Sequence, residues 1–112
     1  MYKVVLDADG LIKLAKAHFV EHLANFATCF ISEEVYHEVV TKGKEKLYED
    51  AFVVEEMVAK RIIKKIMVNK PNIDEKGLGM GEISSLALFQ IQKADAIISD
   101  DHRFLRKLDE LG

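Results

Sequence analysis

The chain has 112 residues, of which 49% are hydrophobic and 31% are charged. This composition excludes a disordered chain and predicts a single folded domain over residues 1–112. The net charge of −3 excludes a protein that binds nucleic acid by bulk positive charge, but not an enzyme that meets nucleic acid through a bound metal. The single cysteine, Cys29, excludes a disulfide framework and a thiolate metal site. Its apolar neighbours predict a buried thiol.

The sequence contains no 18-residue apolar run, and its first residues lack the charged and apolar regions of a signal peptide. We therefore expect no membrane span and a cytoplasmic protein.

The N-terminal half alternates short apolar runs with helical patterns. The run at 2–6 predicts a buried strand, and the stripe of apolar residues at 10–17 predicts a helix. A shorter helical segment is expected at 20–26, before a second strand at 27–31. Ser32 then provides a good N-cap for the next helix.

The C-terminal half begins with apolar residues at spacings of three and four over 44–65. They predict one long helix, whose broad apolar face covers the core or contributes to a dimer interface. A short strand is expected at 66–68, a helix at 82–92, a buried strand at 96–99 and a closing helix at 102–111. This alternation predicts a three-layer α/β/α fold with a central parallel sheet of about four short strands.

Two pairs of acids directly follow predicted strands. Asp7 and Asp9 follow the first strand, and Asp100 and Asp101 follow the strand at 96–99. Because parallel strands end at the same edge of a sheet, both pairs are expected where such folds bind ligands. Clustered carboxylates repel one another without a cation, and hard oxygen ligands suit Mg²⁺ or Mn²⁺. A metal held there can activate water and hold a phosphate.

Two further acids stand at suggestive places. Glu38 lies on the helix after the second strand, and Glu82 begins a helix after a glycine-rich loop. Taken alone, each is an ordinary surface acid, and a carboxylate at a helix start also favours the helix dipole. The sequence has no G-x-S-x-G motif, no P-loop and no His/Cys cluster, so metal-dependent chemistry is favoured over a protein nucleophile.

Four segments, taken in order, resemble the PIN domain, the nuclease fold of VapC-type toxins and related archaeal and bacterial proteins. The segments are VVLDADGLIKLAK, ISEEVYHEVV, GEISSLALFQ and ADAIISDDHRFLRKL. The resemblance implies that four residues are the metal-binding, catalytic acids: Asp7, Glu38, Glu82 and Asp101.

Neighbouring residues acquire roles from the same resemblance. Asp100 is an alternative metal ligand to Asp101, and Ser99 matches a small hydroxyl position that could contact substrate. Asp9 falls where the family often has Ser or Asn, so it adds a ligand or only fixes the turn. Arg103 replaces an acid that many members have. The family usually has a short strand after the last helix, and we expect this strand to be absent here or supplied otherwise.

The resemblance implies an endoribonuclease that uses Mg²⁺ or Mn²⁺ and forms a homodimer. It is also compatible with the toxin of a toxin–antitoxin pair, in which a small antitoxin protein blocks the acidic pocket. The total charge is negative, so contact with RNA is expected from local basic residues. These are Lys13, Lys16, Arg103, Arg106 and Lys107.

Two other interpretations stay open. The first is a non-catalytic PIN-like module that binds protein or RNA, which Arg103 and the short C-terminus suggest. The second is a haloacid dehalogenase-like phosphatase, because VVLDADG also resembles its hydrophobic-D-x-D-G-T motif. There Asp7 would be the nucleophile and Asp9 the acid/base, although Leu11 replaces the threonine.

Overall fold

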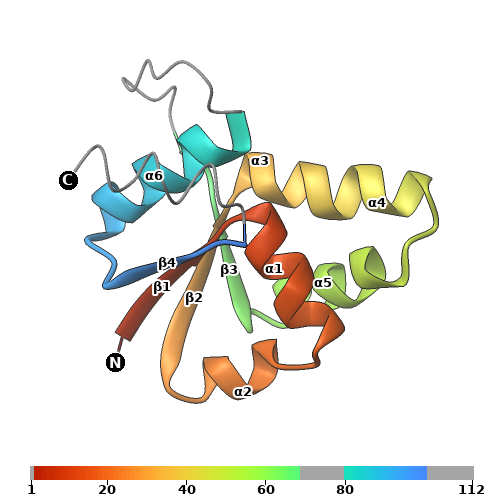
Figure 1. Ribbon diagram of the computed structural model, residues 1–112, viewed down its shortest axis with the longest axis horizontal. Coiled ribbons are helices and arrows are strands. Elements are labelled where there is room, and N and C mark those ends of the chain that lie inside the picture. Colours follow the sequence, from red (N-terminus) through yellow and green to blue (C-terminus); the bar gives the residue numbers. More distant parts are fainter. Residues whose placement is uncertain (1, 69–79, 101–112) are drawn as a thin grey trace.

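The computed structural model describes residues 2–68 and 80–100. The strands in these residues form one parallel sheet in the order β3-β2-β1-β4 (Figure 1). Their bounds are β1 Tyr2–Leu6, β2 Ala27–Ser32, β3 Ile63–Ile66 and β4 Ala96–Ile98. Parallel neighbours need crossover connections, and helices supply them here. The predicted parallel sheet of about four short strands is therefore confirmed.

Helices cover both faces of this sheet, as Figure 1 shows. Their bounds are α1 Ala8–Lys16, α2 Val20–Ala24, α5 Glu49–Ala59 and α6 Met80–Gln92. Successive strand residues point to opposite faces. Val4 and Leu6 accordingly join the core cluster that includes Leu11 and Val54, whereas Val5 packs in the cluster of Leu88. The three-layer α/β/α arrangement is thus confirmed.

A continuous helical arm extends from the sheet after β2 (Figure 1). It consists of α3 (Glu33–Tyr36), the π-helix η1 (His37–Thr41) and α4 (Lys42–Glu45). Ser32 caps the arm as predicted, because its Oγ accepts a 3.1 Å hydrogen bond from the Val35 amide. A π-helical turn holds an extra residue and frequently occurs at functional sites. Here that turn contains Glu38.

The prediction of one long helix over 44–65 is wrong. The arm ends at Glu45, Leu47 takes a left-handed conformation with φ of 59°, and α5 begins only at Glu49. The two helices then fold back on each other, since a β-carbon on Gly43 would lie 2.8 Å from Cβ of Ala51. Leu47 is 79% exposed, so its apolar character belongs to a turn and not to a buried stripe.

The third strand also lies earlier than predicted. We expected it at 66–68, but β3 covers Ile63–Ile66 and pairs with β2 from Cys29 to Ser32. Ile63 is fully buried while Lys64 and Lys65 are exposed. Lysines are typical of edge strands because they discourage pairing with other chains. They also hide the apolar run by which a buried strand is recognised.

Four helices end through a left-handed residue that is not glycine. His18, Leu47, Arg61 and Lys93 have φ between 52° and 61°, after α1, α4, α5 and α6 respectively. At the end of α1, the His18 amide donates to Ala15 O and the Phe19 amide to Leu14 O. This is the Schellman hydrogen-bond pattern, and the same pair of bonds recurs at the other three helix ends.

Two further predictions concern burial. Cys29 is 1% exposed, and burial raises the pKa of its thiol, so the predicted buried cysteine is confirmed. Within residues 2–68 and 80–100, no helix combines the length and the hydrophobicity that a membrane crossing requires. The helix predicted at 102–111 lies outside the described residues.

Candidate active site

Three polar residues stand in a row at the carboxyl edge of the sheet. The register pairs Val5 with Phe30 and Leu6 with Ile98. Continued to the strand ends, it places Asp7 beside Ser32 on one side and Ser99 on the other. Because neighbouring strands are about 5 Å apart, these three side chains share one edge. The sheet itself therefore creates the polar row.

Asp7 is the fixed centre of this row. Its side chain is only 2% exposed, and Oδ1 accepts a 2.8 Å hydrogen bond from the Gly10 amide. The Ser99 hydroxyl donates to Oδ2, and the Asp7 amide donates to Ile98 O at 3.1 Å. A buried carboxylate is costly unless such donors satisfy it. Asp7 is therefore held in one orientation by both flanking segments.

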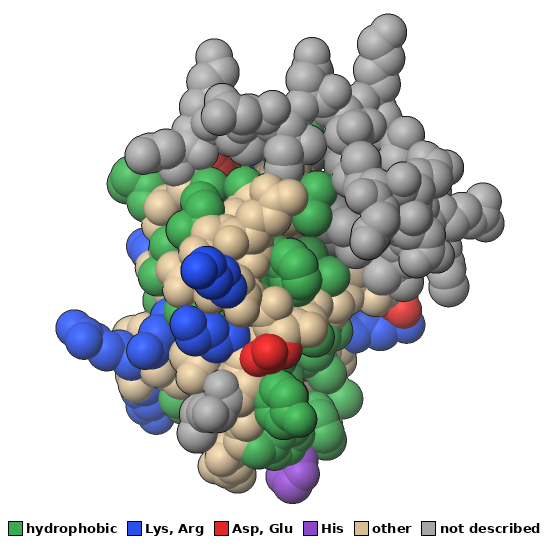
Figure 2. Space-filling model, turned by 90° about the vertical axis from the view of Figure 1, so that its left-hand side faces the viewer, with side chains coloured by type: hydrophobic (Ala, Val, Ile, Leu, Met, Phe, Trp, Pro, Cys, Tyr) green, Lys and Arg blue, Asp and Glu red, His purple; other side chains and the backbone are tan. Residues whose placement is uncertain are grey.

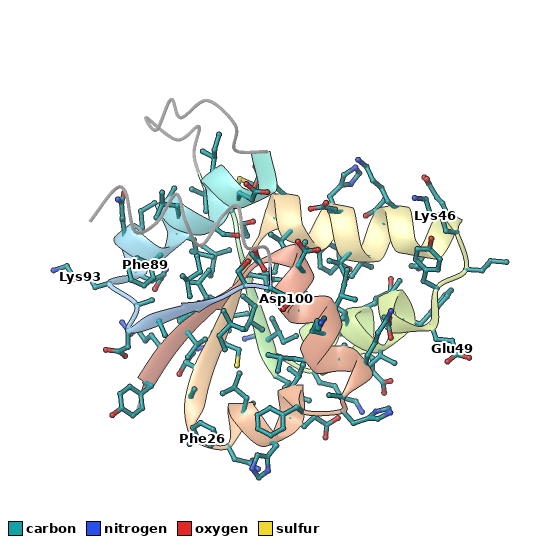
Figure 3. The ribbon with its side chains drawn as sticks, in the orientation of Figure 1. Phe26, Lys46, Glu49, Phe89, Lys93 and Asp100 are labelled. Atoms are coloured by element: carbon teal, nitrogen blue, oxygen red, sulfur yellow. The ribbon has the colours of Figure 1, made fainter. Side chains whose placement is uncertain are left out.

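Asp100, the next residue after Ser99, lies on the rim. Figure 3 shows it at the end of β4, close to the start of α1. Its carboxylate forms a 3.0 Å ion pair with Lys13, and the side chain is 49% exposed. Asp9 is exposed in the first turn of α1. Asp101 and Arg103 lie outside the described residues.

Glu38 and the start of α6 face each other across a second gap. A β-carbon on Gly81 would lie 3.1 Å from Oε2 of Glu38, so this carboxylate reaches the first turn of α6. Glu82, the residue after Gly81, is half-buried in that same turn. The helical segments that carry two of the predicted acids therefore meet beside the Glu38 carboxylate.

Two buried serines connect these helices. Ser32 Oγ lies 2.7 Å from Ser84 Oγ, and Ser84 also donates to the Gly81 carbonyl at 2.8 Å. Sequence interpretation identified Ser32 as a cap but missed Ser84. No pattern in the sequence distinguishes Ser84 from its neighbour Ser85, whose buried hydroxyl lacks a hydrogen-bond partner in the part of the chain that the structure describes.

Glu34 is a further acid that sequence interpretation missed. Its Oε2 atom is buried and has no hydrogen-bond partner among the described residues. Glu34 precedes Glu38 by one helical turn, so both side chains leave the same side of the arm. This spacing was the available signal. A buried carboxylate oxygen without a donor is unfavourable, and a cation would satisfy it.

The donor chemistry of this edge fits a hard divalent cation. Its charged groups are carboxylates, and Mg²⁺ and Mn²⁺ prefer such oxygen ligands to sulfur. The orphaned Oε2 of Glu34 adds an unsatisfied oxygen to them. Over residues 2–68 and 80–100, no three Asp, Glu, His or Cys side chains are arranged as a complete metal site. The edge thus supplies suitable ligands without an assembled cage.

Acidic side chains are sparse on one face of the molecule. Figure 2 shows the face on the left-hand side of Figure 1, where basic and hydrophobic side chains intermingle and acidic ones are sparse.

Comparison with known proteins adds one positive finding: a family model of the PIN domain matches residues 3–112. No curated protein matches the chain.

Proposed function

The chain belongs to the PIN domain family, and from this membership we propose that it is a divalent-metal-dependent ribonuclease. PIN domains are generally nucleases. The proposed reaction is hydrolysis of an RNA phosphodiester by a metal-activated water.

One observation carries the proposal: the buried, doubly hydrogen-bonded carboxylate of Asp7 at the edge of the sheet. An acid needed only for capping a helix does not require burial on this scale. Within a sheet of this type, ligands bind beyond the carboxyl ends of the strands. Asp7 is therefore the residue around which we propose that the site forms.

The other carboxylates would complete the ligand set. Glu38, Glu82 and Glu34 would join Asp7 in holding Mg²⁺ or Mn²⁺, together with Asp101. The metal would supply an acidified water and neutralise charge on the phosphate. Ser99 donates to Asp7 and so fixes the direction of that carboxylate. Its proposed role is orientation of a ligand rather than direct contact with substrate.

Basic residues of α1 support contact with RNA. Lys13 is paired with Asp100 and Lys16 with Asp50, yet both lysine side chains are about 70% exposed. Exposed ion pairs are weak and exchange readily, so a phosphate can replace the carboxylate. Such contacts make binding sensitive to salt.

Assembly is a further part of the proposal. Large apolar side chains are exposed around the turn between α4 and α5: Leu47, Tyr48, Phe52 and Val53. They support the proposed homodimer, because exposed apolar patches often mark interfaces. The proposed antitoxin partner and the toxin role rest on the family resemblance.

A non-catalytic PIN-like module is the second candidate function. It is favoured by the lack of an assembled three-ligand group within the described residues. The haloacid dehalogenase-like interpretation is disfavoured by the family match and by the exposed position of Asp9.

Cleavage of a labelled single-stranded RNA by the purified chain tests the proposal. We expect cleavage with Mg²⁺ or Mn²⁺, none with EDTA, and loss of more than about 100-fold in Asp7→Asn. Glu56→Gln, which removes an acid from the exposed ion pair with Lys60 on α5, serves as the control. Metal-dependent cleavage that is equal in the wild type and Asp7→Asn would point to a contaminating nuclease and reject the proposed site.

A further inference from the structure

Ser32 and Ser84 form a buried link between the two helical segments that carry Glu38 and Glu82. The two hydroxyl oxygens are 2.7 Å apart, and the side chains are 0% and 1% exposed. We propose that this pair positions the two acids, setting the gap between them and thereby the affinity of the site for its metal. The inference rests on the proposed metal-dependent function.

The direction of every hydrogen bond in the link follows from the donors available. The Val35 amide donates to Ser32 Oγ at 3.1 Å, and Ser84 donates to the Gly81 carbonyl at 2.8 Å. A hydroxyl has only one hydrogen, and that of Ser84 is already used. Ser32 must therefore donate to Ser84. The chain runs from the Val35 amide through both hydroxyls to the Gly81 carbonyl without a gap.

The ends of this chain lie beside the acids. Val35 and Glu38 both approach Gly81, since a β-carbon there would lie 3.9 Å from Val35 Cγ2 and 3.1 Å from Glu38 Oε2. Glu82 directly follows Gly81. A shift of the first turn of α6 relative to α3 would therefore change the separation of the Glu38 and Glu82 carboxylates.

Because the serine pair is buried, it fixes the relative position of α3 and α6 as well as holding them together. Removed from water, the Ser32 hydroxyl uses Ser84 as the acceptor for its hydrogen, which strongly favours one relative position of the helices. Residues that hydrogen-bond around metal ligands commonly change metal affinity by about 10- to 100-fold when they are replaced.

The adjacent Ser85 offers a matched control. It lies on the same helix, is also buried, and its hydroxyl has no hydrogen-bond partner within the described residues. Ser85→Ala removes the same atom as Ser84→Ala, one residue away, but leaves the link intact.

The test measures Mn²⁺ binding by titration calorimetry on folded, full-length variants, with stability in EDTA recorded separately. We expect Ser84→Ala to weaken Mn²⁺ binding by about 10-fold and Ser85→Ala by less than about twofold. Ser84→Ala keeps the Ser32 cap on α3, so it spares the fold more than Ser32→Ala does. The Ser32→Ala/Ser84→Ala double variant should lose no more affinity than the weaker-binding single variant, because either change breaks the same chain.

The outcomes separate the inference from the proposed function. If the wild type binds Mn²⁺ and Asp7→Asn does not, but Ser84→Ala binds like Ser85→Ala, the positioning role is wrong while the metal site stands. Losses that simply add in the double variant would also overturn a shared link. If the folded wild type binds no Mn²⁺, the proposed function and the inference both fail.

Discussion

The two halves of the candidate site are built in opposite ways. On the β1 side, Asp7 is 2% exposed and each of its carboxylate oxygens has a donor from the chain. On the arm side, Glu38 is an exposed residue of the π-helical turn, and Glu34 keeps a buried oxygen without a partner among the described residues. One half is fixed by hydrogen bonds before any ligand arrives, whereas the other half contains a buried carboxylate oxygen that still needs a partner.

This difference suggests how affinity and stability are divided. A carboxylate held by a backbone amide and a serine costs little further ordering when it binds a cation. Carboxylates brought close to one another are held at a cost that a cation would remove. Changes in the Asp7 half should therefore affect folding first, and changes in the Glu38 half should affect metal binding first.

The largest expected effect lies in the Asp7 half, with Gly10→Ala. The added β-carbon would lie 2.4 Å from the Ile98 carbonyl oxygen, a backbone atom that cannot rotate away. We expect a loss of about 3 kcal/mol in the free energy of unfolding, measured by urea denaturation in EDTA.

Gly43→Ala provides the comparison for that variant, because its β-carbon would meet the Ala51 side chain at the far end of the arm. Both variants crowd a helix, but only Gly10→Ala displaces the segment that ends in Ser99. Equal metal affinity in wild type and folded Gly10→Ala would contradict the view that this segment fixes Asp7.

In the Glu38 half, Gly81→Ala should change metal affinity and folding stability in opposite directions. The new β-carbon would lie 3.1 Å from Glu38 Oε2, the end of a flexible side chain that can move aside. Alanine also favours the helix, so stability in EDTA should rise by about 0.5 kcal/mol. We expect Mn²⁺ binding, followed by calorimetry, to weaken by about 10-fold. A variant that is stabilised but binds Mn²⁺ normally would contradict a role for the Glu38–Gly81 contact in metal binding.

Glu34→Gln sharpens the comparison further. The change should raise the free energy of unfolding in EDTA by about 0.5–1 kcal/mol, because the desolvation cost of the partly buried charge and its repulsion with Glu38 outweigh the helix-dipole attraction that is also lost. The stabilisation gained on adding Mn²⁺ should shrink. Glu33→Gln is the matched control, since it removes only a favourable helix-dipole charge and should destabilise slightly. Thermal unfolding with and without Mn²⁺ measures the expected stabilisation in Glu34→Gln and the expected destabilisation in Glu33→Gln.

The smallest effect is expected at the rim. Lys13→Met breaks the exposed ion pair with Asp100 and should change stability by less than about 0.5 kcal/mol. If Lys13 also meets phosphate, the slope of RNA affinity against salt concentration should fall by about one. An unchanged slope in filter-binding assays would remove Lys13 from the RNA surface.

Much of the fold was predictable because buried parallel strands are visible in the sequence as short apolar runs. β1 and β2 each contain a short apolar run, and Ser32 caps a helix as its hydroxyl suggests. The prediction failed at 44–65, where apolar residues kept a helical spacing across a turn. Leu47 and Tyr48 are exposed there, and sequence spacing does not reveal burial.

The candidate site was predictable in part for a related reason. Parallel strands end at the same edge of a sheet, so the positions of Asp7 and Ser99 at one edge could be anticipated. The Ser32–Ser84 bond spans 52 residues and depends on how α6 lies against α3. Nothing local in the sequence encodes that contact, and nothing local separates Ser84 from the unbonded Ser85.

The four left-handed helix ends have a practical consequence for engineering this protein. His18, Leu47, Arg61 and Lys93 each adopt a backbone conformation that glycine takes at lower cost. The chain therefore holds a reserve of stability at four helix ends. A variant with glycine at one or two of them would tolerate damaging substitutions at the sheet edge that the natural background would not survive. The stability available at the helix ends thus determines how many destabilising changes at the site the protein can accept before it unfolds.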